Sequence, residues 1–281
     1  MIYYKHHLLQ EEITALKLKK QSIGFVPTMG ALHEGHLSLV SKALRENDTV
    51  VVSIFVNPTQ FDKIEDLQKY PRTLDADATL LKTLPGNILL FVPEPQDLYG
   101  EHIASKKYNF GGLEHQMEGK YRLGHFDGVG TVLNLLFRVV VPHKSYFGEK
   151  DFQQLQIAKK LVEIEKLPVK VIGCPILRED SGLAMSSRNK RLSKKLLQEA
   201  IVIHRTLSEV QKNYKHLSIS KLRKLVQDAF NENEYLELEY FEIANIKNLK
   251  TAQRIRQGGI YRAFIAAFAG EVRLIDNVAL N

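Results

Sequence analysis

Short, almost wholly apolar runs separated by longer amphipathic stretches are the feature that most constrains the fold of this chain. Five such runs precede residue 176, namely residues 23–26, 50–56, 88–92, 145–147 and 169–174. Apolar runs without polar alternation are typical of strands covered on both faces, and strands that alternate with helices are typical of βαβ units. The pattern therefore predicts a parallel sheet, and ligands of such sheets bind beyond the carboxyl ends of the strands.

Helices are expected where apolar residues recur at a spacing of three to four. In the first part of the chain these segments are 35–46, 73–84, 126–140 and 151–167. Beyond residue 177 the pattern changes to two long helices, 193–214 and 218–231, followed by strand-like runs at 236–244, 261–268 and 272–275. The sequence thus predicts an α/β domain over residues 1–176 and a smaller C-terminal α+β domain over residues 177–281.

Composition fits a globular protein with two cores, since 44% of the 281 residues are hydrophobic. No apolar run approaches the roughly 20 residues of a membrane span, and the start of the chain has no signal-peptide pattern. We therefore expect a cytoplasmic protein without a membrane partner. The single cysteine, Cys174, lies in an apolar run and is expected to be a buried structural thiol.

The net charge of +7 is unevenly spread, because residues 1–176 hold 21 basic and 20 acidic side chains whereas residues 177–281 hold 18 and 12. A basic second half fits either nucleic-acid binding or a cationic lid over a polyphosphate. Aromatic residues interleaved with the charges, which single-strand binders need, are not evident there. We therefore favour the lid and expect no nucleic-acid partner.

The segment from Ile23 to His36 leads from an apolar run through a glycine-bearing turn into two histidines. His33 and His36 are three residues apart, so at the start of a helix they share a face and can donate hydrogen bonds to one phosphate. The helix amino terminus also favours anions. Gly35 between them lets a base or ribose approach the backbone closely. A pair of surface histidines at a helix start is the alternative interpretation.

A second motif, Met185-Ser186-Ser187-Arg188, offers two hydroxyls and a guanidinium, which suit triphosphate oxygens as charge moves onto pyrophosphate. Alone, it also fits a serine loop that caps a helix. With the two histidines upstream, it resembles the signature segments of nucleotidyltransferases and class I aminoacyl-tRNA synthetases, which transfer AMP or CMP to an acceptor. We expect residues 178–189 to close over ATP as a mobile lid, because they are rich in Gly, Ser and Arg.

The chain closely resembles the pantothenate synthetase (pantoate-β-alanine ligase) family along its whole length, in order. The segments that carry this resemblance are 25–36, 52–61, 70–73, 147–155 and 185–189. One small departure is Leu123, where the family usually has proline, and it removes no reacting group. The resemblance implies a Rossmann-like nucleotidyltransferase domain, a smaller C-terminal domain and a homodimer.

Two half-reactions follow from this resemblance. ATP and (R)-pantoate give pantoyl adenylate and pyrophosphate, and β-alanine then displaces AMP to form pantothenate. A carboxylate is ionised at pH 7 and needs no base, so the protein must align it and stabilise the phosphates. The nearest rival is an adenylyltransferase with another acceptor. A rival of a different class is an RNA-binding module that uses the basic C-terminal half.

Family matching also implies roles for individual residues. His33, His36 and Lys150 are the catalytic candidates that stabilise phosphates, with His36 the candidate proton donor, and Asp151 would accept hydrogen bonds from the ribose. The implied ATP-binding residues are Met29, Gly30, His33, Gly35, His36, Gly148, Glu149, Lys150, Asp151, Leu177, Met185, Ser186, Ser187 and Arg188. A solvated lysine and a helix-capping aspartate are the structural alternatives for Lys150 and Asp151.

Gln60 and Gln154 are the candidates for binding pantoate and β-alanine, because an amide donates to a carboxylate and accepts from a hydroxyl. Their structural alternative is a surface glutamine. Pantoate's paired methyl groups need an apolar wall. Its possible members are Met29, Val129, Val132 and Phe147, although such residues more often simply form core.

Magnesium is expected to accompany ATP and to be held mainly by phosphate and water, so we expect no metal ligand from the protein. Asp75 and Asp77 are acidic enough to help, but a first-turn helix aspartate is the commoner role. Asn57 and Arg122 are further candidates for phosphate or substrate contacts.

Overall fold

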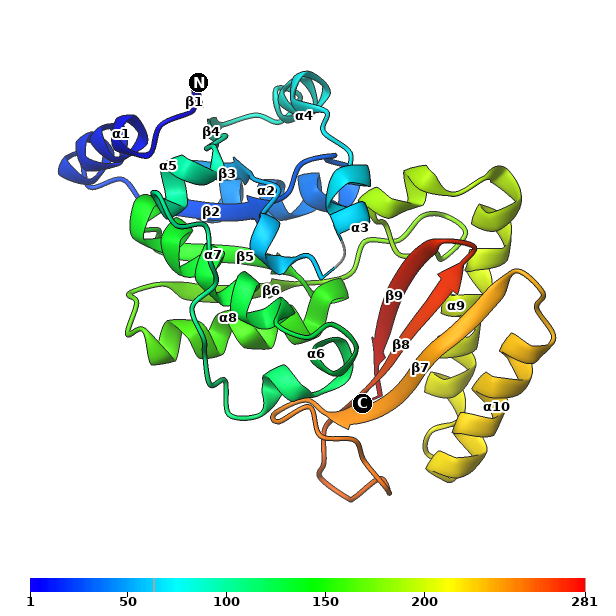
Figure 1. Cartoon of the computed structure of the whole chain (residues 1–281). Helices are drawn as coiled ribbons and strands as arrows, with labels where there is room; N and C mark the ends of the chain where they lie inside the picture. Colours follow the sequence, from blue (N-terminus) through cyan, green and yellow to red (C-terminus); the bar gives the residue numbers. More distant parts are fainter. Residues whose placement is uncertain (63, 281) are drawn as a thin grey trace. The chain divides into compact units, whose positions relative to one another are not determined.

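A computed structural model describes residues 1–62 and 64–280, and the chain divides into two compact units (Figure 1). The N-terminal unit contains Met1–Glu149 and Gln153–Pro175. The C-terminal unit contains the rest of the described chain, from Ile176 onward, together with the short segment Lys150–Phe152. Three residues in the middle of the sequence, among them the predicted catalytic residue Lys150, therefore pack with the C-terminal unit.

A six-stranded sheet forms the centre of the N-terminal unit, and all its strand pairs are parallel. The strands are β1 (Ile2–Tyr3), β2 (Ile23–Thr28), β3 (Thr49–Ile54), β4 (Asn87–Phe91), β5 (Lys144–Gly148) and β6 (Lys170–Cys174). Their order across the sheet is β1-β4-β3-β2-β5-β6. This order confirms the predicted α/β architecture.

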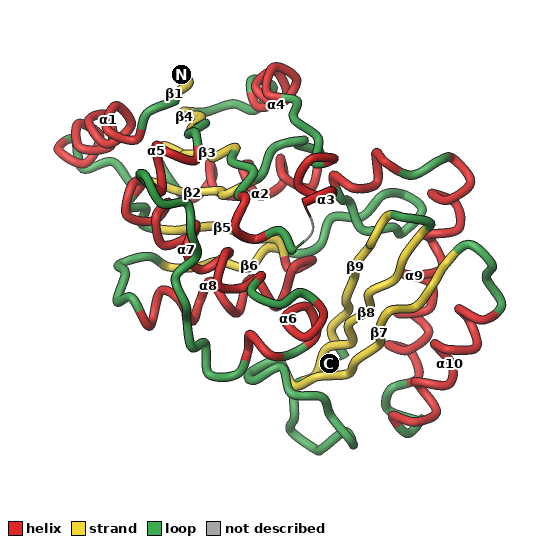
Figure 2. Tube along the Cα trace, in the orientation of Figure 1, coloured by secondary structure: helices red, strands yellow, loops and turns green. Residues whose placement is uncertain are grey.

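Helices connect these strands and cover the sheet (Figure 2). They are α1 (His6–Leu18), α2 (Glu34–Glu46), α3 (Ile64–Lys69), α4 (Leu74–Leu81), α5 (Pro95–Tyr99), α6 (Met117–Tyr121), α7 (His125–Val140) and α8 (Phe152–Ile164), with 3₁₀ turns at Pro58–Gln60, Leu113–His115 and Glu149–Asp151. Val26 packs in one cluster with Leu37 and Val40 of α2, whereas the ring of Phe25 lies 6.1 Å from that of Phe137 of α7. Successive residues of β2 thus face different helices, which explains the continuous apolar run.

The C-terminal unit has an antiparallel sheet of β7 (Leu236–Asn245), β8 (Tyr261–Ala269) and β9 (Val272–Ala279). The helices α9 (Lys194–Asn213) and α10 (Ile219–Asn231) run along this sheet, as Figure 2 shows, and a 3₁₀ turn spans Ser187–Arg191. Ile203 and Leu207 of α9 share a buried core with Val226 of α10 and Ile265 of β8. This is the predicted α+β arrangement.

The long predicted helices and strands agree with the structure to within a few residues at their ends. β1 and α1 are not among the predicted elements, although Leu9, Ile13 and Leu16 of α1 are buried at helical spacing. Nor are α3, α5 and α6, which have six residues or fewer. No helix within the described residues is both long enough and apolar enough to span a bilayer.

Candidate active site

The candidate residues of the N-terminal unit gather where the strand order of its sheet reverses. β2 pairs with β3 on one side and with β5 on the other, so the chain moves outward in both directions from this strand. Ligands of open parallel sheets bind in the crevice beyond the carboxyl ends at such a point. Met29, Asn57 and Gly148 stand at or just beyond the carboxyl ends of these strands, which brings three of the predicted segments to one edge.

The two histidines stand at the amino terminus of α2. His33 is the N-cap residue, and its Nδ1 accepts a hydrogen bond of 3.1 Å from the backbone N–H of Gly35. The ring centroids of His33 and His36 are 4.1 Å apart, and both side chains are partly exposed. Because Nδ1 of His33 is the acceptor, the proton of the neutral ring is on Nε2. The predicted pair of imidazoles at a helix amino terminus is therefore present.

The turn before α2 is held by a carboxylate that sequence reasoning did not assign to it. Gly30 and Ala31 both have positive φ, at 84° and 49°. The side chain of Asp77, only 2% exposed, accepts hydrogen bonds from the backbone N–H groups of Ala31 at 2.9 Å and Leu32 at 2.8 Å. Its Oδ1 also accepts a bond from the hydroxyl of Thr73. Asp77 thus fixes the turn, and both its oxygens are already engaged as acceptors.

Gln60 is 9% exposed, and its side chain is held at both ends. Its Oε1 accepts a hydrogen bond from Nδ2 of Asn57 at 3.2 Å, and its Nε2 lies 3.0 Å from the sulfur of Met29. Asn57 in turn accepts a bond of 2.6 Å from the hydroxyl of Tyr99. The structure therefore brings together Met29, Asn57 and Gln60, which the sequence presents as separate candidates for ligand contacts.

The backbone of Gln60 is held by the start of α7. His125 Nδ1 lies 2.8 Å from the Gln60 carbonyl oxygen, and its Nε2 lies 3.2 Å from the guanidinium of Arg122. Burial, together with the nearby positive charge of Arg122, lowers the pKa of His125 to about 4. The ring is therefore neutral at pH 7, with Nδ1 as donor and Nε2 as acceptor. The guanidinium of Arg122 also donates to the backbone carbonyl of Gln60 at 3.4 Å. The neighbouring Leu123 is 85% exposed.

Close approach of α7 to the loop after β3 depends on Gly128. Nδ2 of Asn57 donates to the Gly128 carbonyl at 3.2 Å, and a Cβ at this position would collide with the backbone carbonyl of Thr59. Val129, Val132 and Phe147, the possible apolar wall, are all buried. A side chain larger than hydrogen at residue 128 would push α7 away from Asn57 and Gln60.

Two adjacent glutamines at the start of α8 have different environments. Gln153 is 4% exposed, donates to the carbonyl groups of Leu113 and Gln116 at 2.8 Å each, and accepts a bond from the Glu118 N–H. Gln154 is partly exposed. Gln153 is thus structural, and Gln154 is the glutamine accessible to a substrate.

Gly148 ends β5, and an added Cβ at this position would meet no atom within 4 Å. Glu149 beside it is partly exposed.

In the C-terminal unit, Lys150 lies in the 3₁₀ turn Glu149–Asp151. Its ammonium is 3.6 Å from Oδ1 of Asp151, and the Lys150 side chain is 18% exposed. Nδ2 of Asn277 donates to the carbonyl oxygen of Lys150 at 2.8 Å. The backbone of this lysine is therefore anchored to β9, while its side chain forms an ion pair with the aspartate that follows it.

The second motif follows a hairpin rather than a loose loop. The Met185 N–H donates to the Leu177 carbonyl, the turn contains Gly182 with φ 91°, and Arg178 pairs with Ala184 in a β-bridge. The guanidinium of Arg178 forms hydrogen bonds of 2.7 and 3.0 Å to the two oxygens of Asp276. These bonds fix the hairpin within the C-terminal unit, so closure of residues 178–189 alone would have to break them.

Beyond the hairpin, Ser186 caps the 3₁₀ turn Ser187–Arg191, because its side chain accepts a hydrogen bond from the Arg188 N–H. Ser187 is 7% exposed, whereas Met185 and Arg188 are partly exposed. Asn189 donates to the carbonyl of Ala184 and to the carboxylate of Glu179. Ser186, a predicted phosphate ligand, is therefore also the capping serine of the alternative interpretation.

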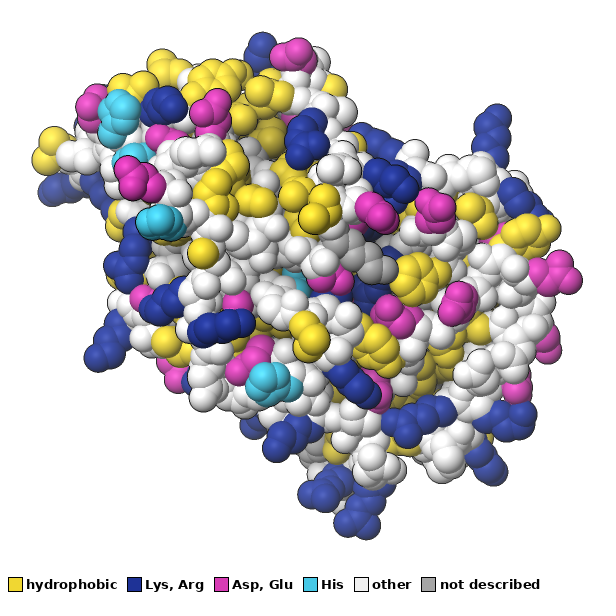
Figure 3. Space-filling model, viewed as in Figure 1, with side chains coloured by type: hydrophobic (Ala, Val, Ile, Leu, Met, Phe, Trp, Pro, Cys, Tyr) yellow, Lys and Arg dark blue, Asp and Glu magenta, His cyan; other side chains and the backbone are white. Residues whose placement is uncertain are grey.

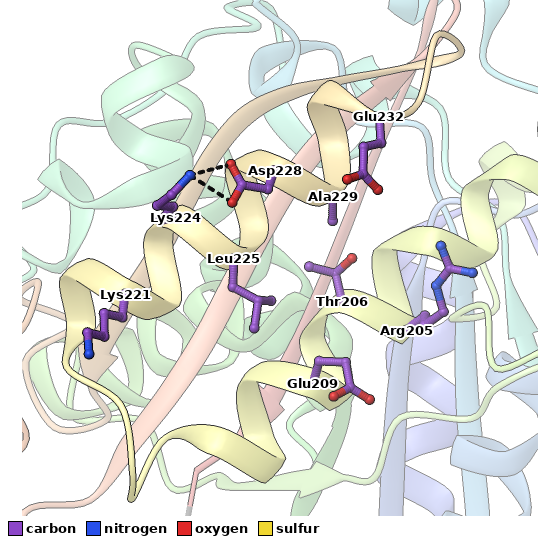
Figure 4. Close-up of a pocket in the computed structure, with 9 residues that line it drawn as sticks. All are labelled: Arg205, Thr206, Glu209, Lys221, Lys224, Leu225, Asp228, Ala229 and Glu232. Carbon is purple, nitrogen blue, oxygen red and sulfur yellow. Dashed lines mark hydrogen bonds and ion pairs between the residues drawn. The ribbon is translucent and has the colours of Figure 1, made fainter.

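A groove between α9 and α10 has a volume of about 670 Å³ and contains none of these residues (Figure 4). Its lining mixes both charges, and Figure 4 shows the ion pair of Lys224 with Asp228 at its side. Among the described residues, no group of three or more His, Cys, Asp and Glu side chains is arranged to hold a metal ion.

A family model for pantoate-beta-alanine ligase matches residues 1–279 of this chain. The chain belongs to the pantoate-β-alanine ligase family. A pantothenate synthetase of Christiangramia forsetii is 52% identical over 280 residues, covering 100% of this chain and 99% of that protein. One from Flavobacterium psychrophilum is 51% identical and covers 93% of each chain.

Solved structures of this ligase family have the same fold. A crystal structure of pantothenate synthetase from Thermus thermophilus has a TM-score of 0.91 at 37% identity and covers 99% of both chains. That of pantoate-beta-alanine ligase from Francisella tularensis, complexed with beta-gamma ATP and β-alanine, has a TM-score of 0.82 at 36% identity. It covers 100% of this chain and 97% of that one.

Membership of the ligase family explains why the motifs occur in this chain. It does not identify the residues that hold these motifs in place. Asp77 and His125 make buried hydrogen bonds to the backbone of Ala31 and of Gln60, and Asp276 makes partly buried hydrogen bonds to the side chain of Arg178. The sequence alone presents Asp77 only as a helix-start aspartate or a metal ligand. A polar residue within an apolar helical pattern was the only available signal, and it does not identify a partner 46 residues away.

Proposed function

We propose that this chain condenses (R)-pantoate with β-alanine in an ATP-dependent reaction that passes through pantoyl adenylate. One observation carries the site assignment: a histidine pair suited to phosphate and a fixed amide suited to a hydroxy acid stand at adjoining strand ends of the N-terminal sheet. His33 and His36 begin α2 after β2, and Gln60 follows β3 with its side chain between Asn57 and Met29. Such a pair of subsites fits a reaction that joins a nucleotide to an acid.

In the first half-reaction, a carboxylate oxygen of pantoate attacks the α-phosphorus of ATP and pyrophosphate leaves. His33 and His36 donate hydrogen bonds to phosphate oxygens, with His36 the candidate proton donor to the leaving group. The helix dipole of α2 adds to this positive field. Gln60 and Gln154 hold the hydroxy acid, so that its carboxylate is in line with the phosphorus.

The C-terminal residues contribute cations and hydroxyls to the same triphosphate in this proposal. Lys150 and Arg188 neutralise charge that moves onto pyrophosphate, and Ser186 and Ser187 donate hydrogen bonds. Asp151 accepts hydrogen bonds from the ribose hydroxyls. The remaining ATP contacts come from the backbone around Gly30, Gly35 and Gly148, and from Glu149, Leu177 and Met185. Closure over ATP then involves the predicted C-terminal domain, residues 177–281, rather than its hairpin alone.

In the second half-reaction, the amine of β-alanine attacks the acyl carbon of pantoyl adenylate. The C–N bond forms, the bond between the acyl carbon and the AMP oxygen breaks, and AMP leaves. A protonated amine must lose a proton before it attacks, so this step is expected to accelerate as pH rises.

Magnesium is proposed to accompany ATP and to be bound mainly by phosphate and water. The geometry of Asp77 is consistent with this assignment, because both its oxygens already accept hydrogen bonds from Ala31, Leu32 and Thr73. When bound, magnesium would neutralise charge on the phosphates. We further propose a cytoplasmic homodimer.

Exchange of labelled pyrophosphate into ATP tests this function. Exchange that requires pantoate and proceeds without β-alanine is expected, because only the first half-reaction produces pyrophosphate. Exchange that another acceptor supports and pantoate does not would assign the chain to a different acceptor.

An RNA-binding role of the basic C-terminal half has its own test, which is RNA retention that falls steeply as salt rises. On the face drawn in Figure 3, Lys and Arg side chains are interspersed with Asp and Glu over much of the surface. This distribution favours the small-molecule reaction over a continuous nucleic-acid surface.

A further inference from the structure

Two adjacent residues near the end of β9 hold two different segments of the candidate ATP site. Asp276 is 4% exposed and Asn277 is 2% exposed. Asn277 donates to the carbonyl of Lys150, and Asp276 accepts two bonds from Arg178 at the base of the hairpin that leads to Ser186. The two residues are also joined, since the backbone N–H of Asn277 donates to Oδ1 of Asp276 at 2.7 Å.

One face of the C-terminal sheet contacts both the first and the last residue of the short segment Lys150–Phe152. Asn277 is the cross-strand partner of Phe264, and Arg262 precedes Phe264 by two residues, so these three side chains share a face. The guanidinium of Arg262 donates to Oδ1 of Asn277 and stacks 4.3 Å from the centroid of the Phe152 ring. That ring lies 5.9 Å from the ring of Phe264. This contact set explains why the segment packs with the C-terminal unit.

The opposite face holds the hairpin. Asp276 lies on the same face of β9 as Leu274 and Val278, which belong to the core that α9 and α10 cover. Its carboxylate meets the guanidinium of Arg178, which also donates to the carbonyl of Gly182 at 3.0 Å. At Gly182 an added Cβ would collide with the ring of His204 of α9. The hairpin is thus fixed through a partly buried ion pair and through close packing at its turn.

We propose that Asp276 and Asn277 are positioning residues that set the Lys150 ammonium and the Ser186–Arg188 loop in one frame for the triphosphate. The inference rests on the proposed function, because it requires Lys150 to act on ATP. Transition-state stabilisation by fixed donors depends on their placement, and a displacement of about 1 Å can reduce a rate on the order of a hundredfold. A single strand that grips both segments keeps their spacing constant.

The test is a double-mutant cycle between Asn277→Asp and Lys150→Ala, read by single-turnover release of pyrophosphate from ATP and pantoate. Asn277→Asp retains the size of the side chain and an acceptor for Arg262, but it removes the donor to the Lys150 carbonyl. We expect release to slow about tenfold to a hundredfold, because the lysine is displaced but present. In the Lys150→Ala background the same substitution is expected to slow release by less than about twofold, since its effect acts through the lysine.

Gln211→Leu is the matched control, because Gln211 Nε2 donates to the Ala279 carbonyl on the same strand at 2.7 Å. It is expected to leave pyrophosphate release unchanged. The pantoate KM of Asn277→Asp is also expected to stay within about twofold of the parent, because the proposed pantoate ligands are Gln60 and Gln154 and not Lys150. Asn277→Ser, whose side chain is too short to make both contacts, replaces Asn277→Asp if the latter does not fold.

The outcomes separate this inference from the proposed function. A slow Lys150→Ala variant with normal release in Asn277→Asp overturns the positioning role alone, as do effects that multiply in the double variant. Normal release in Lys150→Ala removes that lysine from the reaction, and the positioning role is then overturned with it.

Discussion

Two loops of the candidate site are each held by one buried aspartate, but the partners of the two carboxylates differ. Asp77 accepts hydrogen bonds from the backbone N–H groups of Ala31 and Leu32, whereas Asp276 accepts bonds from the guanidinium of Arg178. A loop held by its own backbone keeps its shape when its side chains change. The hairpin that is held through Arg178 loses this anchor in one substitution and then relies on the packing at its turn.

The loops also differ in how their active side chains are presented. His33 and His36 follow directly from the turn that Asp77 fixes, and they begin a thirteen-residue helix. Ser186, Ser187 and Arg188 follow the hairpin in a short 3₁₀ turn. Helix α2 thus supplies a rigid platform with a dipole, whereas the serine loop relies on capping bonds and on its hairpin. We therefore expect loss of the Arg178 contact to displace more of the serine loop than loss of any one residue displaces of the first loop.

The largest expected effect comes from removing one catalytic candidate from each region. His36→Ala and Lys150→Ala should each slow adenylate formation by roughly two to four powers of ten, as loss of a preorganised donor typically does. Stopped-flow release of pyrophosphate measures this rate. His7→Ala and Lys159→Ala, which change exposed residues of the same types, serve as controls. Near-normal rates in both catalytic variants would remove these residues from the mechanism.

The second prediction compares the carboxylates directly through the free energy of unfolding. Asp276→Asn should cost about 3 kcal/mol, because it leaves the largely buried guanidinium of Arg178 without its counter-charge. Asp77→Asn should cost about 1 to 3 kcal/mol, because an amide NH₂ then faces one of two backbone donors. Urea unfolding of both variants measures the difference. A larger loss in Asp77→Asn would reverse the ranking of the two loops.

The third prediction is a pH dependence that belongs to the N-terminal region. The folded-state pKa of His125 is lowered from 6.5 to about 4 by burial, so the unfolded chain takes up this proton first. The stability that His125 contributes is complete above pH 6.5 and is lost progressively as pH falls towards 4, to a total on the order of 3 kcal/mol. Urea midpoints of the parent and of His125→Gln across this range measure it. Parallel pH profiles for the two proteins would contradict the prediction.

The smallest expected effect concerns the acid substrate. Gln60→Leu or Gln154→Leu should raise the pantoate KM about tenfold, because each leaves a polar group of the substrate unpaired at a cost of about 1 to 3 kcal/mol. The KM for ATP should change little. Gln153→Leu is an informative contrast: it should lower stability through the lost bonds to Leu113 and Gln116 while leaving the pantoate KM intact. Loss of ATP binding with intact pantoate binding would show that the assignment of Gln60 and Gln154 to the pantoate subsite is wrong.

Local pattern was sufficient for the fold class and for most long elements. Helix α2 begins one residue before its predicted start at Gly35, and α7 begins one residue before Phe126. These boundaries are set by nearby residues and by apolar spacing, which a sequence displays directly. The two-residue strand β1 is different, because it exists only through pairing with β4 at Leu90 and Phe91. Nothing local distinguishes such a strand from a chain end.

The site was predictable where chemistry and spacing coincide, and not where a contact joins distant segments. The histidine pair is visible in the sequence because its members are three residues apart. The bond of Asp77 to Ala31 and that of Asn277 to Lys150 span 46 and 127 residues. Gln153 and Gln154 show the same limit, since two identical side chains in sequence differ only in which one is buried. The supporting contacts of a site are thus the part that requires the folded chain.

The only cysteine of the protein offers a built-in reporter of unfolding. Cys174 ends β6, is 3% exposed, and has its pKa raised to about 11, mainly by burial. A folded molecule therefore presents almost no thiolate to an alkylating reagent, whereas an opened sheet presents an ordinary one. Labelling kinetics with a maleimide would report the opening of the N-terminal unit alone, without any engineered probe. The N-terminal region can thus be followed in the unmodified chain.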